Sequence, residues 1–241
     1  MEMAETVVIS FLSKAPTHQK VRDSSAAVDN YVLHGRRANA HSVNHVGTPF
    51  GSGLPGAVTN AFEEYMLAHE LGHISLGHVT AQQIRYHSPR KGPSFEVVEK
   101  NEFKEFQADL WAIRMLLACA RNRRRSDSDI PLAVGGISLG LGTGLLVEAF
   151  AAKHGIQFSR DHPAANERLY MAQVAYELFG AHEDAYVARR FDELLEEIVK
   201  ESYPDASLPP MLARDLNQKM IQVLDSLGID YSKAPYIKDF T

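Results

Sequence analysis

The chain has 241 residues, of which 45% are hydrophobic, and a formal net charge of −5. This is enough apolar sequence for one sizeable core, so we expect a single domain over residues 1–241. The acidic balance argues against nucleic-acid binding, which usually needs a basic domain. A single cysteine, Cys119, excludes a fold stapled by internal disulfides and favours a reducing, cytoplasmic location.

The predicted elements are mainly helical, with a small β element near the N-terminus. Residues 6–12 (TVVISFL) are rich in β-branched side chains and predict a strand, and the acidic start before them is unlike a secretory signal. The glycine- and asparagine-rich half of residues 23–60 predicts a loop with a short edge strand near 42–49. Apolar spacing predicts helices over residues 61–79, 95–121, 164–179, 184–202 and 211–227.

The longest uncharged run covers residues 130–147 and is of borderline length for a membrane span. It follows a basic cluster at residues 121–125, as a membrane span often does. Five glycines interrupt the run, which favours a buried helix or a glycine-rich helical hairpin in the core. A membrane-anchored protein that uses residues 130–147 is the alternative.

Residues 69–73 (HELGH) form a candidate metal site on the helix predicted over 61–79. A spacing of four residues places His69 and His73 on one helix face, about 6 Å apart, where both rings can bind one tetrahedral metal. Glu70 is rotated by about 100°, so its carboxylate lies beside the metal and can act as a general base toward a water molecule. The pattern H-E-x-x-H therefore predicts a zinc-dependent hydrolase.

The third protein ligand must come from elsewhere in the chain. His78 lies about 140° around the helix from His73, so we interpret it as a helix-end or surface histidine. The next predicted helix offers Glu105 and Asp109, again four residues apart on one face. Glu105 can complete the zinc site, and Asp109 can accept a hydrogen bond from a ligating histidine and fix its tautomer. The alternative is an exposed acidic stripe.

This order of motifs resembles the gluzincin metallopeptidases, and above all the family of the CAAX prenyl endopeptidases and HtpX. H-E-x-x-H is followed by E-x-x-x-D on a second helix and then by residues 162–168, which match H-P-x-x-x-x-R. The resemblance implies that His162 stabilises the oxyanion of the tetrahedral intermediate. It also implies that Arg168 steadies the glutamate ligand or the oxyanion side of the site. The fold it implies is an α+β, zincin-like domain with a motif core at 61–180 and a helical extension at 181–241.

The chain departs from that family in several features. It has no clear pairs of membrane helices, and its apolar segment follows the E-x-x-x-D helix instead of preceding it. A soluble relative, such as one like the phage-exclusion peptidase Lit, is therefore included in the prediction. We expect a zinc metalloendopeptidase that acts on a protein or peptide substrate and binds one Zn²⁺ per chain. A catalytically silent binding module on the same fold is the competing hypothesis.

Overall fold

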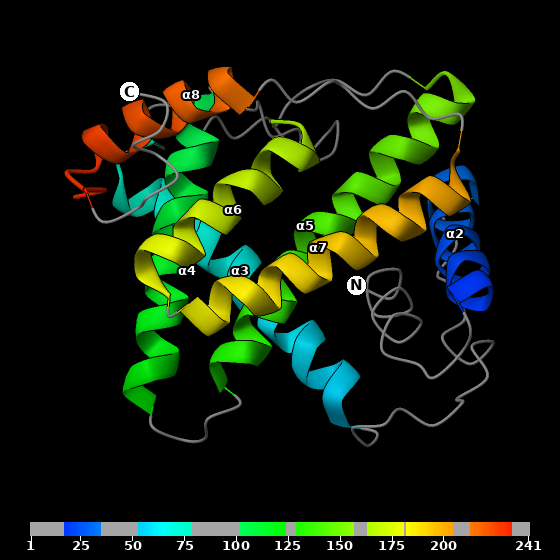
Figure 1. Cartoon of the computed structure of the whole chain (residues 1–241), viewed down its shortest axis with the longest axis horizontal. Helices are drawn as coiled ribbons and strands as arrows, with labels where there is room; N and C mark the ends of the chain where they lie inside the picture. Colours follow the sequence, from blue (N-terminus) through cyan, green and yellow to red (C-terminus); the bar gives the residue numbers. More distant parts are fainter. Residues whose placement is uncertain are drawn as a thin grey trace, which may run out of the picture.

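The computed structural model describes residues 17–34, 53–78, 102–123, 129–156, 163–180, 182–204 and 213–232. Within these ranges the chain forms seven α helices (Figure 1). In chain order they are α2 (Thr17–His34), α3 (Gly53–Ser75), α4 (Glu102–Arg123), α5 (Asp129–His154), α6 (Ala165–Phe179), α7 (His182–Ser202) and α8 (Ala213–Ser226).

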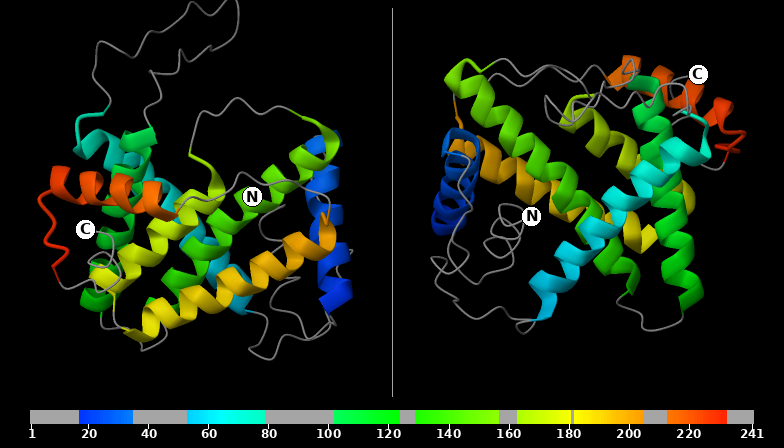
Figure 2. Two further views of the ribbon diagram at one scale, coloured as in Figure 1. Left: turned by 45° about the horizontal axis from the view of Figure 1, so that its top comes forward. Right: turned by 180° about the vertical axis from the view of Figure 1, so that it is seen from behind.

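The predicted α+β class is wrong, because the described part of the chain is helical and contains no strand. The predicted strands at residues 6–12 and 42–49 lie outside the described residues. The physical reason is that α3 is backed by α4 and α5 (Figure 2) and not by a sheet. A β-branched run forms a stable strand only where partner strands exist, and no described segment supplies one.

Residues 130–147 belong to a single continuous helix, α5, so the helical-hairpin interpretation is also wrong. Among the described residues, Ile130–His154 is long and apolar enough to cross a membrane by length and composition alone. However, 61% of its most apolar window is buried inside the protein. A central helix of a soluble protein has the same properties, and α5 contacts α3, α6 and α7 here.

The glycines of α5 explain how closely it packs against its neighbours. A Cβ atom at Gly136 would lie 2.8 Å from the Val58 carbonyl oxygen, and one at Gly140 would lie 1.8 Å from the Phe62 ring. On another face, a Cβ at Gly142 would lie 2.1 Å from a methyl group of Leu195 on α7. The glycines therefore let α3 and α7 approach the axis of α5.

One hydrophobic core joins all seven helices. Its largest fully buried side chains come mainly from α4, α5 and α6, and Tyr65 of α3 is buried among them. The helices α3 and α4 pack side by side, and this contact decides which faces of the two predicted motifs meet.

Candidate active site

Two side chains of α3 and one of α4 converge on a single point. His69, His73 and Glu105 each offer one ligand atom, and these atoms lie within 4.8 Å of one another. His69 and Glu105 are buried and His73 is half-buried. The structure thus brings together the three residues predicted as metal ligands.

The distances between the histidine nitrogens and the two carboxylate oxygens are close to the edge length of a zinc tetrahedron. The two histidine Nε2 atoms are 3.1 Å apart, and they lie 3.3 Å and 3.4 Å from the two carboxylate oxygens of Glu105. Zinc ligands at 2.0–2.1 Å from the metal would be about 3.3 Å apart along each edge of the tetrahedron. A cation at the centre would also relieve the repulsion among these electron-rich atoms.

Behind His69 lies a buried ionic network that begins at Asp109. The Nδ1 atom of His69 is 2.7 Å from one Asp109 oxygen, to which the Tyr65 hydroxyl also donates at 2.5 Å. Arg168 donates to both oxygens of the same carboxylate, from Nε at 2.8 Å and from a terminal nitrogen at 2.7 Å. Asp109 thus holds the His69 ring through its Nδ1 atom, which turns Nε2 toward Glu105.

The pKa values in this network follow from burial and charge together. Burial would raise the pKa of Asp109, but the Arg168 guanidinium and the His69 hydrogen bond outweigh it and hold that pKa well below its usual value. Burial lowers the pKa of His69, whereas its bonds to Asp109 and Glu105 raise it, with a net result of about 9. The site therefore favours a positive charge between His69 and Glu105, and a divalent metal would replace the proton there.

A comparison with protein families identifies the family of the chain. The model of the family described as Peptidase U49 matches residues 57–190, which is more than half of the chain. The chain belongs to the peptidase U49 family. No curated protein and no solved structure matches it. The expectation of a peptidase is thereby confirmed at the level of the family, and the match begins within α3 and ends within α7.

In this U49 peptidase, the candidate base Glu70 and the histidine His78 differ in their exposure to solvent. Glu70 is exposed on α3, next to His69. His78 follows the end of α3, as expected, but it is buried and not on the surface. Its Nδ1 atom is 3.0 Å from Nδ1 of His73. The expected orientation away from His73 is wrong because Gly77 has a φ of 70°, which turns the chain back.

Of the two residues that the resemblance places in catalysis, Arg168 and His162, the structure describes only Arg168. Arg168 is brought to the site by α6, where it pairs with Asp109. Its hydrogen bonds go to Asp109 and to the Tyr65 hydroxyl. The role that the resemblance implied, steadying the glutamate ligand or the oxyanion side of the site, stays a prediction. His162 lies outside the described residues, directly before Pro163, which is buried.

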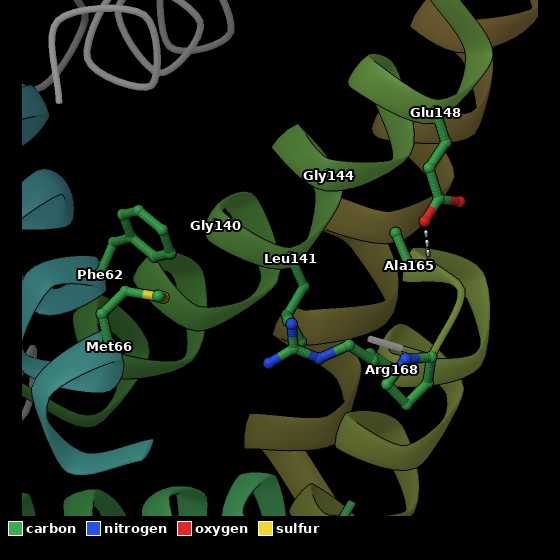
Figure 3. A pocket seen from close by; sticks show the side chains of 9 residues that line it. Phe62, Met66, Gly140, Leu141, Gly144, Glu148, Ala165 and Arg168 are labelled. Carbon is green, nitrogen blue, oxygen red and sulfur yellow. Dashed lines mark hydrogen bonds between the residues drawn. The ribbon is translucent and has the colours of Figure 1, made fainter. Parts of the chain in front are cut away.

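A cavity of about 140 Å³ adjoins the site between α3, α5 and α6 (Figure 3). Phe62, Met66 and Leu141 give it apolar walls, and Glu148 and Arg168 add polar groups to its lining. Met66 lies one helical turn before Glu70 on α3. One wall of the cavity therefore lies about one helical turn from the candidate base.

Sequence reasoning missed two residues that support the site. Tyr65 lies four residues before His69, a helical spacing that would have placed it on the same face. Glu148 of α5 accepts a hydrogen bond from the backbone N–H of Ala165 and so caps the start of α6, which carries Arg168. No sequence signal connects Glu148 with Ala165, because only the packing of α5 against α6 brings them together.

Proposed function

We propose that this U49 peptidase is a zinc-dependent endopeptidase of the gluzincin type. In this proposal His69, His73 and Glu105 hold the metal, and Glu70 is the general base. The observation that carries it is the convergence of the two Nε2 atoms, 3.1 Å apart, on Glu105, whose two carboxylate oxygens lie 3.3 Å from one of them and 3.4 Å from the other. The exposed Glu70, which directly follows His69, supplies the carboxylate base that hydrolysis needs.

Each residue has a defined task in peptide hydrolysis. Bound zinc would act as a Lewis acid that polarises the scissile carbonyl and lowers the pKa of water toward neutrality. Glu70 takes a proton from the attacking water and delivers it to the departing amine. His162 would donate a hydrogen bond to the developing oxyanion. Arg168 acts through Asp109, which orients the His69 ring.

The gluzincin assignment rests on chain order as well as on geometry. The glutamate ligand comes from the helix that follows H-E-x-x-H, and its partner Asp109 lies one turn later. The same order is found in the family of the CAAX prenyl endopeptidases and HtpX, to which we propose a relationship. The proposed substrate is a protein or peptide with an apolar side chain that fits the cavity beside Met66.

The decisive experiment is Glu70→Gln, with Glu63→Gln as the matched control. Both glutamates are exposed on α3, seven residues apart and on one side of the helix. Elemental analysis should find one zinc per chain in all three proteins. Hydrolysis of denatured casein should fall by a factor of about 10² or more in Glu70→Gln and stay unchanged in Glu63→Gln. Full activity of Glu70→Gln would refute the mechanism.

The metal ligands are tested separately with Glu105→Ala. This variant should lose most of its zinc, because two histidines alone form an incomplete site. Unchanged zinc content would remove Glu105 from the ligand set. If the wild-type protein binds zinc but cleaves nothing in a broad peptide library, with or without chelator, the silent binding module becomes the better explanation.

We further propose that α5 is a core helix of a cytoplasmic enzyme. The support is its close contact with α3 and α7 through Gly136, Gly140 and Gly142. A membrane-anchored peptidase is the second candidate, because α5 is long and apolar enough to span a bilayer. Fractionation of the full-length protein should recover it in the high-speed supernatant. Recovery only after detergent extraction would favour the membrane form.

A further inference from the structure

The end of α3 has a geometry that links His78 to the metal site. The backbone N–H of His78 donates to the carbonyl of His73 at 2.8 Å, and that of Gly77 donates to Ile74 at 3.1 Å. With Gly77 at a φ of 70°, these two bonds form a Schellman motif. In that motif the residue after the glycine contacts the residue five positions earlier, usually through apolar side chains. Here the contact joins two histidines.

The side chains of His78 and His73 are joined as well. Their Nδ1 atoms are 3.0 Å apart and their ring centroids 5.1 Å apart. On its other side, the Nε2 atom of His78 is 2.9 Å from the Oε1 atom of Gln107 on α4. The Nε2 atom of Gln107 donates to the hydroxyl of Ser226 at 2.8 Å, and Ser226 donates to the Val223 carbonyl at 2.6 Å.

The direction of every hydrogen bond in this series follows from the protonation of His73. If His73 binds the metal through Nε2, its proton must be on Nδ1, so it donates to Nδ1 of His78. The proton of His78 is then on Nε2, which donates to the only acceptor of the Gln107 amide. That leaves the Gln107 amino group to donate to Ser226. Each group therefore has a defined role as donor or acceptor, and the series ends on the backbone carbonyl of Val223.

We propose that His78 is a positioning residue for the metal ligand His73. His78 accepts a hydrogen bond from the Nδ1–H group of His73. Gln107 and Ser226 hold His78 in the tautomer that this bond requires. This inference rests on the proposed zinc site. It adds that the helix-ending motif at Gly77 is part of the site, because it places His78 over His73.

Zinc affinity, measured by competition with a chromogenic chelator, tests the proposal without any substrate. His78→Ala should lower the affinity by a factor of about 10–100, as is usual when the partner of a ligand is removed. His78→Gln should restore most of it, since an amide can accept from His73 and donate to Gln107. His18→Ala, an exposed histidine on α2, is the matched control and should bind zinc like the wild type.

A second pair of variants separates positioning from general loss of stability. Gly77 and Gly155 both end helices with positive φ, at 70° and 63°, and at both positions an added Cβ atom would meet nothing within 4 Å. Alanine should strain both turns equally, but only Gly77→Ala should weaken zinc binding. If His78→Ala does not fold, Gln107→Met removes the acceptor of His78 at similar volume, and it should also weaken binding.

Nitrogen-15 NMR of the zinc-loaded protein gives a direct readout of the tautomer. We expect the His78 proton on Nε2 and the His73 proton on Nδ1. A His78 proton on Nδ1, or wild-type zinc affinity in folded His78→Ala, would overturn the inference and leave the zinc peptidase intact. Failure of the wild-type protein to bind zinc would instead overturn the proposed function itself.

Discussion

The two halves of α3 are held by their neighbours in opposite ways. In the N-terminal half, Val58 and Phe62 meet the glycines of α5, and the contact is apolar and close. In the C-terminal half, Tyr65 and His69 meet Asp109 and Arg168 through hydrogen bonds between buried polar and charged groups. The same helix thus changes from steric contact to polar contact within about two turns.

The difference separates two tasks that an active-site helix must combine. Close contact with α5 fixes where α3 lies, because any added atom at Gly140 would overlap Phe62. Hydrogen bonds through Asp109 fix how the His69 ring is turned, because a carboxylate accepts only along particular directions. We therefore expect changes in the first half to affect stability and to leave zinc binding intact. Changes in the second half should affect both stability and zinc binding.

The largest expected effect is that of Asp109→Ala. This change removes the carboxylate that pairs with the Arg168 guanidinium. The Arg168 side chain is only 16% exposed, so its charge would be left largely buried and unpaired. Removing one partner of a buried ion pair costs about 3–5 kcal/mol in the free energy of unfolding. Urea denaturation should show this loss, and zinc affinity should fall with it.

A double variant provides the control for that prediction. Asp109→Leu combined with Arg168→Leu removes both charges, so neither is left buried and unpaired. Its free energy of unfolding should recover most of the about 3–5 kcal/mol lost in Asp109→Ala. Its zinc affinity should stay low, because His69 still lacks its acceptor. Equal stability of Asp109→Ala and the wild type would show that the network contributes nothing to folding.

The next effect is that of Gly140→Ala, in the contact between α3 and α5. The new methyl group would meet the Phe62 ring at 1.8 Å, and overpacking of this kind costs about 1–3 kcal/mol. Gly56→Ala is the matched control on α3, since no atom lies within 4 Å of the Cβ position there. That change should stabilise the helix by about 0.4–1 kcal/mol. A large loss of zinc affinity in Gly140→Ala would contradict the division of tasks.

The polar half of α3 was largely predictable from the sequence. Helical spacing places His69 and His73 on one face, and the same spacing relates Glu105 to Asp109. Metal chemistry limits the residue types that can meet there, so short motifs carry three-dimensional information. What the spacing could not show is that Arg168 pairs with Asp109, since that bond depends on how α6 packs against α4.

The apolar half was not predictable in the same way. Glycine at 136, 140 and 142 indicates close approach but not the approaching helix, so a hairpin and a membrane span stayed open beside a buried helix. The expected α+β class was wrong for the described residues because a run of β-branched residues describes a local preference, whereas a strand needs partners. The buried position of His78 was missed because a single residue, Gly77, reverses the direction of the chain.

A smaller effect is expected for Tyr65→Phe, at the boundary between the two halves. The variant keeps the ring and removes only the hydroxyl that donates to Asp109. A hydrogen bond to a charged acceptor contributes about 1.5–3 kcal/mol, so we expect a loss near the lower end of that range. Tyr186→Phe is the control, because Tyr186 is 62% exposed on α7. An equal loss in both variants would remove Tyr65 from the network.

The smallest effect is that of Glu148→Ala, which links the two halves through α6. Ala164 caps α6 without a side-chain hydrogen bond, so the Glu148 carboxylate supplies one by accepting from Ala165 N–H at 2.9 Å. Loss of a helix cap costs about 0.5–1 kcal/mol. Amide hydrogen exchange at Ala165 should accelerate, and Glu148→Gln should preserve part of the protection because its carbonyl still accepts.

The zinc affinity of Glu148→Ala shows whether this cap matters for the site. If α6 frays and zinc affinity falls about two- to threefold, the position of Arg168 depends on α5. The two halves of α3 are then coupled through α6. Unchanged zinc affinity despite faster exchange would show that the Asp109 pair holds Arg168 in place without help from α5.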